Sequence, residues 1–250
     1  MGYTIALAGK GGTGKTTIAA LLVRLMKEKK KGSILAIDAD PNSNLAEALG
    51  LQAKETIGGI LDGISAHPDK IPAGMSKDRF IEYRIQQAIQ EADGFDVLTM
   101  GKPEGPGCYC YVNNCLRNTM GKLIKDYDYI IIDNEAGLEH LSRRTTRCAD
   151  LLLVISDATT AGLRSAQRIH ELAEALDIDI KKSFLIVNRS ASLAGGERVG
   201  RTGLPVLCAV PADKQIEKIS LDGNSLMDLK EDAVSLNALR ELGDTLWALN

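Results

Sequence analysis

The sequence predicts an α/β fold with a mostly parallel central sheet of about seven strands, flanked by helices. Apolar, β-rich runs recur along the chain with helical patterns between them, and this alternation is typical of a parallel sheet. Several runs are continuously apolar, such as residues 130–132 and 151–155, which suits strands buried on both faces. A glycine-rich loop follows the first run and opens the first helical pattern, at the edge where such sheets bind ligands.

The predicted strands cover residues 3–8, 33–37, 95–100, 129–132, 151–155, 184–187 and 206–210. Helical patterns cover residues 16–29, 77–91, 113–125, 165–176 and 228–248. Neither a repeat nor a long linker divides the chain, so residues 1–250 are expected to form a single domain. The least regular stretch, 51–94, contains paired glycines and two prolines, and we interpret it as an inserted helical arm.

Composition narrows the possible partners. The chain has 250 residues, of which 44% are hydrophobic and 25% charged, and its net charge is −3, so no broad basic field favours nucleic acid. No apolar run approaches the roughly 20 residues that cross a membrane. The start of the chain does not have the layout of a signal peptide, and its last helical pattern lacks the basic face of a membrane-surface helix. We therefore expect a cytoplasmic protein without a membrane partner.

A phosphate-binding loop spans residues 9–17. Gly9, Gly14, Lys15 and Thr16 complete the pattern G-x4-G-K-[ST] between a predicted strand and a predicted helix, which is the context that this motif requires. Glycines let successive backbone N–H groups surround a phosphate, Lys15 would reach the β- and γ-phosphates, and the Thr16 hydroxyl would ligate Mg²⁺. The expected nucleotide contacts are Gly11, Gly12, Thr13, Gly14, Lys15, Thr16 and Thr17.

Lys10 is unusual because it places a second lysine inside the loop. Like-charge crowding disfavours both lysines on the phosphates of one subunit, so Lys10 could instead reach the nucleotide of a facing subunit. Residues 9–16 resemble the deviant phosphate loop of the ATPases that include the nitrogenase iron protein, MinD and ParA. The resemblance implies a P-loop NTPase fold like that of the nitrogenase iron protein, an ATP-dependent homodimer and catalytic roles for Lys10 in trans and for Lys15.

Three aspartates follow predicted strands on the same edge of the sheet. Asp38 and Asp40 come after the second strand, and Asp133 follows the apolar run 129–132. Carboxylates at this level can bind Mg²⁺ or orient an attacking water, and Asp133 stands where a Walker-B aspartate holds Mg²⁺. The resemblance implies that Asp40 activates water and that Asp38 supports the metal. The segment 40–43 would also suit a turn and a helix cap, and both roles are compatible.

The same resemblance implies adenine recognition at the ends of the last two strands. It carries this role onto Asn188, which closes the run 184–187, and onto Pro211 and Asp213, which follow the run 206–210. The guanine-reading pattern N-K-x-D is absent, because Arg189 follows Asn188. ATP is therefore favoured over GTP.

A second unusual feature is a metal-binding segment predicted around residues 105–115. A Gly-Pro-Gly turn at 105–107 precedes Cys108 and Cys110, and residues two apart in an extended chain point to one side. Two thiolates are too few for a structural zinc site, which takes four ligands, but two subunits meeting on a two-fold axis would supply four. Chemistry alone leaves zinc, iron–sulfur and nickel open.

A closer resemblance narrows that choice. The phosphate loop, residues 38–41, residues 108–110 and residues 135–141 together look like the CooC-type nickel-maturation ATPases, which serve carbon monoxide dehydrogenase, with AcsF as the related factor for acetyl-CoA synthase. This resemblance implies that Cys108 and Cys110 of both subunits bind Ni²⁺, with Zn²⁺ possible at the same thiolates. It also implies that ATP hydrolysis drives nickel into a client metalloenzyme, with a slight preference for acetyl-CoA synthase.

Two alternatives stay open at this point. One is a partitioning or positioning ATPase like ParA or MinD, which would lack the metal. The other is a redox ATPase with a bridging iron–sulfur cluster like that of the nitrogenase iron protein, in which a second cysteine follows the second switch. The present chain has no cysteine near residues 136–137, and this weakens the redox alternative.

Overall fold

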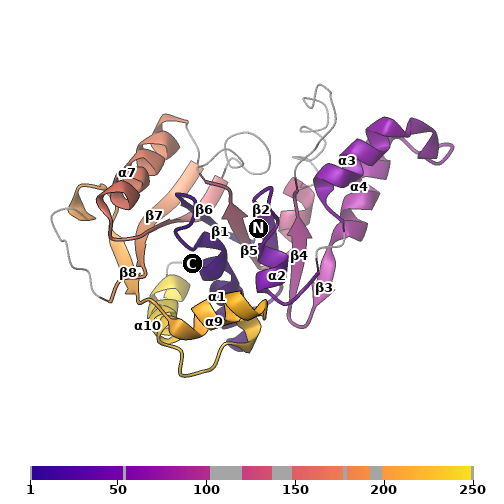
Figure 1. Cartoon of the computed structure of the whole chain (residues 1–250). Helices are drawn as coiled ribbons and strands as arrows, with labels where there is room; N and C mark the ends of the chain where they lie inside the picture. Colours follow the sequence, from indigo (N-terminus) through magenta and orange to yellow (C-terminus); the bar gives the residue numbers. More distant parts are fainter. Residues whose placement is uncertain are drawn as a thin grey trace.

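An eight-stranded sheet forms the centre of the part of the chain that the structure, a computed structural model, describes: residues 2–52, 55–101, 120–136, 148–176, 179–191 and 199–248. The strand order is β3-β4-β2-β5-β1-β6-β7-β8 (Figure 1). All neighbouring strands run parallel except β3 and β4. The predicted α/β class with a mostly parallel sheet is therefore confirmed.

Seven strands correspond to the seven predicted apolar runs. They are β1 (Tyr3–Gly9), β2 (Ile34–Ala39), β4 (Phe95–Thr99), β5 (Tyr129–Asn134), β6 (Cys148–Ser156), β7 (Asp179–Asn188) and β8 (Val206–Val210). The eighth, β3 (Gln90–Ala92), was not predicted, because it is short and polar and pairs antiparallel with β4 at the edge of the sheet.

Helices cover both faces of the sheet (Figure 1). The face that packs on α1 (Lys15–Glu28) also contacts α2 (Leu45–Ala48) and α10 (Val234–Ala248), and the opposite face packs on α3 (Ile57–Ala66), α4 (Lys77–Ala88) and α7 (Thr160–Ala175). Helix α9 (Lys214–Asp222) was not predicted from the sequence. Of the predicted helix over 113–125, only residues from 120 onward are described, with a 3-10 turn at Ile124–Asp126.

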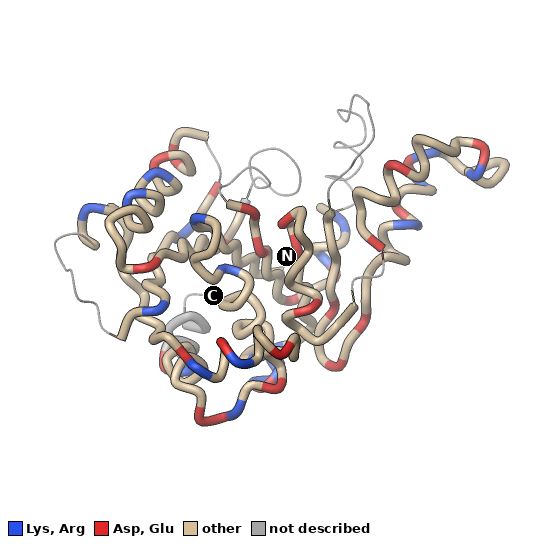
Figure 2. Tube along the Cα trace, in the orientation of Figure 1, with Lys and Arg blue, Asp and Glu red and all other residues tan. Residues whose placement is uncertain are grey.

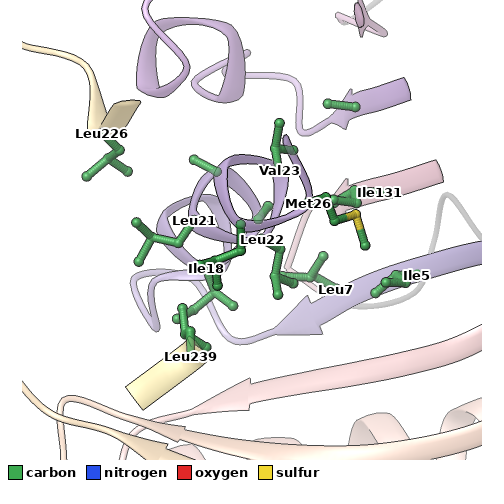
Figure 3. Packing of buried hydrophobic residues seen from close by; sticks show 14 of the residues in the cluster. Ile5, Leu7, Ile18, Leu21, Leu22, Val23, Met26, Ile131, Leu226 and Leu239 are labelled. Carbon is green, nitrogen blue, oxygen red and sulfur yellow. The ribbon is translucent and has the colours of Figure 1, made fainter. Parts of the chain in front are cut away.

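Helix α1 lies at the centre of the largest apolar cluster and positions the phosphate loop that precedes it. Ile18, Leu21 and Leu22 have an exposed fraction of at most 1%. Figure 3 shows their side chains surrounded by residues of β1, β5 and the C-terminal segment. Complete burial of such side chains stabilises a fold by about 1.5–3 kcal/mol each, so the start of α1 is held firmly under the loop.

A buried arginine joins α1 to the C-terminal segment. Arg24 is 5% exposed, and its guanidinium donates to the carbonyls of Leu226 and Leu229 and to the carboxylates of Glu28 and Glu231. Several acceptors share one cation, which is the condition under which a buried charge is tolerated. This network fixes the 3-10 turn Leu226–Asp228 against the phosphate-loop helix.

The stretch predicted as an inserted arm contains α3, a 3-10 turn at Pro68–Lys70 and α4. Figure 1 shows this arm extending outward beside β3 and β4, and Figure 2 shows residues of both charge signs along it. Its base is fixed to the end of β4, because Gly58 N–H donates to the Met100 carbonyl over 2.8 Å. In the described residues, no helix is long and apolar enough to span a bilayer.

Candidate functional site

The phosphate loop connects β1 to α1, as the motif predicts. Gly12 and Gly14 have φ values of +80° and +91°, a left-handed conformation that costs glycine little. The Thr13 hydroxyl donates to the Lys10 carbonyl over 2.8 Å and closes the turn. Helix α1 then begins at Lys15, so its free N–H groups and positive dipole end face the loop, which is a favourable arrangement for an anion.

Asn188 supports the loop from the end of β7. It is 6% exposed, and its amide Nδ2 donates to the Thr13 carbonyl over 2.8 Å. A Cβ added at Gly14 would lie 2.3 Å from the same Nδ2, which is closer than real contacts allow. Glycine is therefore required at position 14 both for its φ and for the close approach of Asn188. Asn188, predicted to contact adenine, thus contacts the phosphate loop itself. Its contact with a base stays a prediction.

Thr16 and Asp133 meet at the mouth of the loop. The Thr16 hydroxyl donates to Asp133 Oδ2 over 2.6 Å. The other carboxylate oxygen, Oδ1, is buried and has no hydrogen-bond partner among the described residues. Burial raises the pKa of Asp133 to about 6, although the Thr16 hydrogen bond and Lys15 act to lower it. A buried carboxylate oxygen without a donor, beside a hydroxyl, fits a Mg²⁺ ion, which prefers oxygen ligands.

Asp38 lies next to Asp133 across the β2–β5 pair and is fully buried. Its two oxygens accept hydrogen bonds from the backbone N–H groups of Asp40, over 3.2 Å, and Leu45, over 2.8 Å. Burial raises its pKa to about 7, with a further contribution from the Asp133 charge. The described contacts of Asp38 therefore shape the loop between β2 and α2, and its predicted support of Mg²⁺ stays a prediction.

Asp40 stands in that loop, half-buried and open to the phosphate side. Its Oδ1 accepts from both the backbone N–H and the side-chain amide of Asn42, each over 2.9 Å. Asp40 also lines a cavity of about 400 Å³ in front of the phosphate loop. Asp40 can therefore both hold the predicted turn and place a carboxylate at the cavity where the phosphates are expected. The cavity is lined by Gly11, Gly12, Gly14, Lys15, Thr16, Asp40, Asn42, Asn44, Glu135, Ala136 and Arg189.

The three residues predicted to read adenine line one cavity of about 430 Å³ between α1, β8 and α9. Asp213 caps two helices there: one oxygen accepts from the Gln215 N–H over 2.9 Å, and the other accepts from the N–H and hydroxyl of Ser235. Burial acts to raise the pKa of Asp213, but these hydrogen bonds hold it below its ordinary value. The lining includes Thr17, Ile18, Leu21, Asn188, Arg189, Val210, Pro211, Ala212, Asp213, Ile216 and Leu221.

Arg189 is a site residue that the sequence analysis did not select. It follows Asn188 and lines both cavities: the one in front of the phosphate loop, called the phosphate cavity below, and the one that contains Asn188, Pro211 and Asp213, called the base cavity after its predicted role. Its φ of 55° lies in the left-handed region, which is uncommon for a residue with a Cβ. The one available signal was its position directly after the strand that ends at Asn188.

The remaining predicted residues are not tested by these contacts. Lys10 is exposed at the rim of the loop, which leaves it accessible to a second subunit. Cys108 and Cys110 lie outside the described residues, as does the second-switch segment after Ala136. Within the described ranges, no group of three or more His, Cys, Asp or Glu side chains could hold a metal ion.

Comparison with known families and proteins agrees with this geometry. Residues 4–226 match the CobQ/CobB/MinD/ParA nucleotide binding domain. An uncharacterized ATP-binding protein of Methanocaldococcus jannaschii is 40% identical over 247 residues, covering 97% of both chains. The carbon monoxide dehydrogenase accessory protein CooC of Rhodospirillum rubrum is 30% identical over 267 residues, covering 96% of this chain and 98% of CooC.

Solved structures share the fold at lower identity. The cell division ATPase MinD of Pyrococcus furiosus superposes with a TM-score of 0.74 at 22% identity, covering 100% of each chain. The septum site-determining protein MinD of Pyrococcus horikoshii, solved with Mg-ADP, superposes with a TM-score of 0.73 at 21% identity, covering 98% and 96% of the two chains.

Proposed function

The chain belongs to the CobQ/CobB/MinD/ParA family of P-loop ATPases, and from this membership we propose that it is a homodimeric nickel carrier whose grip on the metal is set by ATP. Nickel is the cargo in this proposal, and a metalloenzyme that needs nickel is the client. One observation carries the proposal: a Cys-x-Cys pair, Cys108 and Cys110, occurs in a chain that is similar over nearly its whole length to a carbon monoxide dehydrogenase accessory protein.

The paired cysteines give the chemistry of the cargo site. Each subunit contributes two thiolates, so a dimer would offer four around one ion. Four sulfur ligands suit a soft divalent metal, and the similarity to CooC favours nickel among the candidates. The client would be carbon monoxide dehydrogenase or acetyl-CoA synthase.

A chain of backbone hydrogen bonds supports coupling between the nucleotide and the cysteine segment. The Asp38 carbonyl accepts from the Met100 N–H over 2.8 Å, and the Met100 carbonyl accepts from the Gly58 N–H of α3. Gly101, with a φ of +61°, approaches Thr56 so closely that an added Cβ would lie 2.5 Å from the Thr56 Cβ. A shift of the end of β2 at Asp38 would therefore reach Met100 and Gly101, which lead into the cysteine segment.

Hydrolysis uses the groups around the phosphate cavity. Thr16 and Asp133 would hold Mg²⁺, which when bound neutralises negative charge on the phosphates. Lys15 reaches the β- and γ-phosphates, the loop N–H groups cradle the α- and β-phosphates, and Lys10 of the facing subunit adds charge where the transition state needs it. Asp40, anchored through Asn42, orients the attacking water and accepts its proton.

Nickel titration with and without a non-hydrolysable ATP analogue tests the proposal. By linkage, a nucleotide that changes nickel affinity must have its own affinity changed by nickel by the same factor. We expect one nickel ion per two chains and an affinity that differs at least fivefold between the two nucleotide states, a factor within the usual range of coupling energies. Equal affinities in both states would reject the coupling.

The matched variants are Cys108→Ser with Cys110→Ser, and Cys208→Ala. The double serine variant should lose tight nickel binding and keep ATP binding. Cys208 lies in β8, where burial raises the pKa of its thiol to about 12, so it stays protonated and is a poor ligand. Its replacement should leave nickel binding unchanged. Tight nickel binding that survives in the double variant would refute the cysteine site.

A further inference from the structure

Arg189 occupies the junction between the two cavities of the nucleotide site. Asn188, before it, lines the base cavity only, and Gly14 and Thr16 line the phosphate cavity only, whereas Arg189 lines both. A nucleotide bound by a phosphate loop with its base in the neighbouring cavity must pass this junction. The part of the nucleotide that lies there is the ribose with the α-phosphate.

The backbone of Arg189 is held in its unusual conformation from both sides. Its N–H donates to Asn188 Oδ1 over 2.9 Å, and the next N–H, of Ser190, donates to the Val210 carbonyl of β8 over 3.0 Å. A non-glycine residue at φ 55° is strained, and such a conformation persists when its surroundings over-determine it, often at ligand sites. Glycine would adopt this φ without that strain, so the arginine side chain is the feature to explain.

Arg189 is exposed, and its side chain makes no hydrogen bond or ion pair with another described residue. Two acidic side chains, Asp213 and Glu217, line the base cavity, and Asp213 has both oxygens occupied by the starts of two helices. Arg189 therefore presents its positive charge to the junction without a competing carboxylate from that residue.

We propose that Arg189 binds the α-phosphate of the nucleotide held by its own subunit and so acts as a general anchor for nucleotides. The planar fork of arginine suits two phosphate oxygens. Lys15 reaches the β- and γ-phosphates, and the loop N–H groups cradle the α- and β-phosphates. The α-phosphate is the anionic group nearest the junction, where Arg189 adds a positive charge that the N–H groups do not supply. The inference rests on the nucleotide-binding part of the proposed function and is independent of nickel.

The test compares wild type with Arg189→Gly, which suits the left-handed backbone, and with Arg189→Lys, which retains the charge. Calorimetric titration with ADP, IDP and CDP measures affinity. A lost charge-assisted contact should weaken all three by about tenfold in Arg189→Gly, with a smaller loss in Arg189→Lys. Because salt screens exposed charges, the loss should shrink at high ionic strength. Arg164→Ala, at an exposed position on α7, is the control and should bind normally.

Each outcome decides the matter. Equal losses for the three nucleotides support the α-phosphate contact. A loss for ADP that is absent for CDP would overturn it in favour of contact with the base, and unchanged affinities would overturn any contact. A wild-type protein that binds none of the nucleotides would overturn nucleotide binding itself, whereas normal wild-type binding with unaffected variants would overturn the role of Arg189 alone.

Discussion

Replacing Asp133 by asparagine should stabilise the nucleotide-free protein while abolishing Mg²⁺-dependent ATP hydrolysis. Asp133 is 1% exposed, and one of its carboxylate oxygens has no donor in the part of the chain that the structure describes, so its charge is costly until a cation binds. Burial raises its pKa from an ordinary 3.8 to about 6. The folded state therefore holds this proton more tightly than the unfolded state does. As the pH rises through that window, ionisation of Asp133 lowers the free energy of unfolding.

The magnitude follows from the difference between the two pKa values. They differ by roughly two, and each pKa unit corresponds to about 1.4 kcal/mol, so the penalty in wild type approaches an upper bound of about 3 kcal/mol above pH 6. Asparagine cannot ionise, so the variant lacks this penalty. Its advantage over wild type should be near zero at pH 4 and largest at pH 8. The Asp133 charge contributes to the raised pKa of Asp38, so the variant also loses that contribution, which acts in the same direction and adds to its advantage at high pH.

Urea unfolding at pH 4, 6 and 8 without nucleotide or Mg²⁺ measures these free energies, provided that the transition midpoint shifts at constant slope. Asp69→Asn, at an exposed position in the arm, is a control that should shift stability by less than about 0.5 kcal/mol. A variant that is less stable than wild type at pH 8, or a difference that is independent of pH, would show that the charge of Asp133 is not the source of the cost.

Three further changes test other contacts. Gly14→Ala should weaken ADP binding at least tenfold and lower the free energy of unfolding by about 1–3 kcal/mol, because φ is +91° and Asn188 leaves no room for a Cβ. Calorimetric titration measures the affinity and urea unfolding the stability. Normal ADP affinity in this variant would contradict the loop geometry. Arg24→Ala should lower the free energy of unfolding by about 3–5 kcal/mol, because it removes the cation from a buried network. The control Lys122→Ala, whose ion pair is exposed, should lower it by less than about 1 kcal/mol. Equal losses in urea unfolding would refute a stabilising role of the buried Arg24 network. Lys10→Ala should retain ATP binding but lose the ATP-dependent dimer in sedimentation. A dimer that persists in this variant would refute the proposed contact of Lys10 with the nucleotide of the facing subunit.

Much of the fold was predictable because its signals are local. The continuous apolar run in β6 and the strand–glycine–helix context of the phosphate loop depend on neighbours in the sequence, and both predictions were confirmed. Helix α9 was not predictable from its apolar pattern, because only two of its nine residues, Ile216 and Ile219, are aliphatic and pack against the core at helical spacing. Asp213 stands directly before the helix as its N-cap, and this aspartate is the sequence signal for where α9 begins.

The site was predictable only where one side chain has one role. Lys15 and Thr16 follow from their motif. The backbone contacts of Asp38 and the position of Arg189 depend instead on how β2 meets α2 and how β7 meets β8. A left-handed φ at an arginine has no sequence signal comparable to that of glycine. These features need the assembled sheet, so the sequence alone could not supply them.

The double cap at Asp213 ties the starts of α9 and α10 to one carboxylate. Ser235, near the start of the final helix, donates to the same side chain that begins the helix beside the base cavity. A chain shortened before Ser235 would leave a buried acceptor empty at the wall of that cavity. Loss of the final helix would thus alter the wall of the cavity that contains Asn188, Pro211 and Asp213, although no described residue after Ser235 lines that wall.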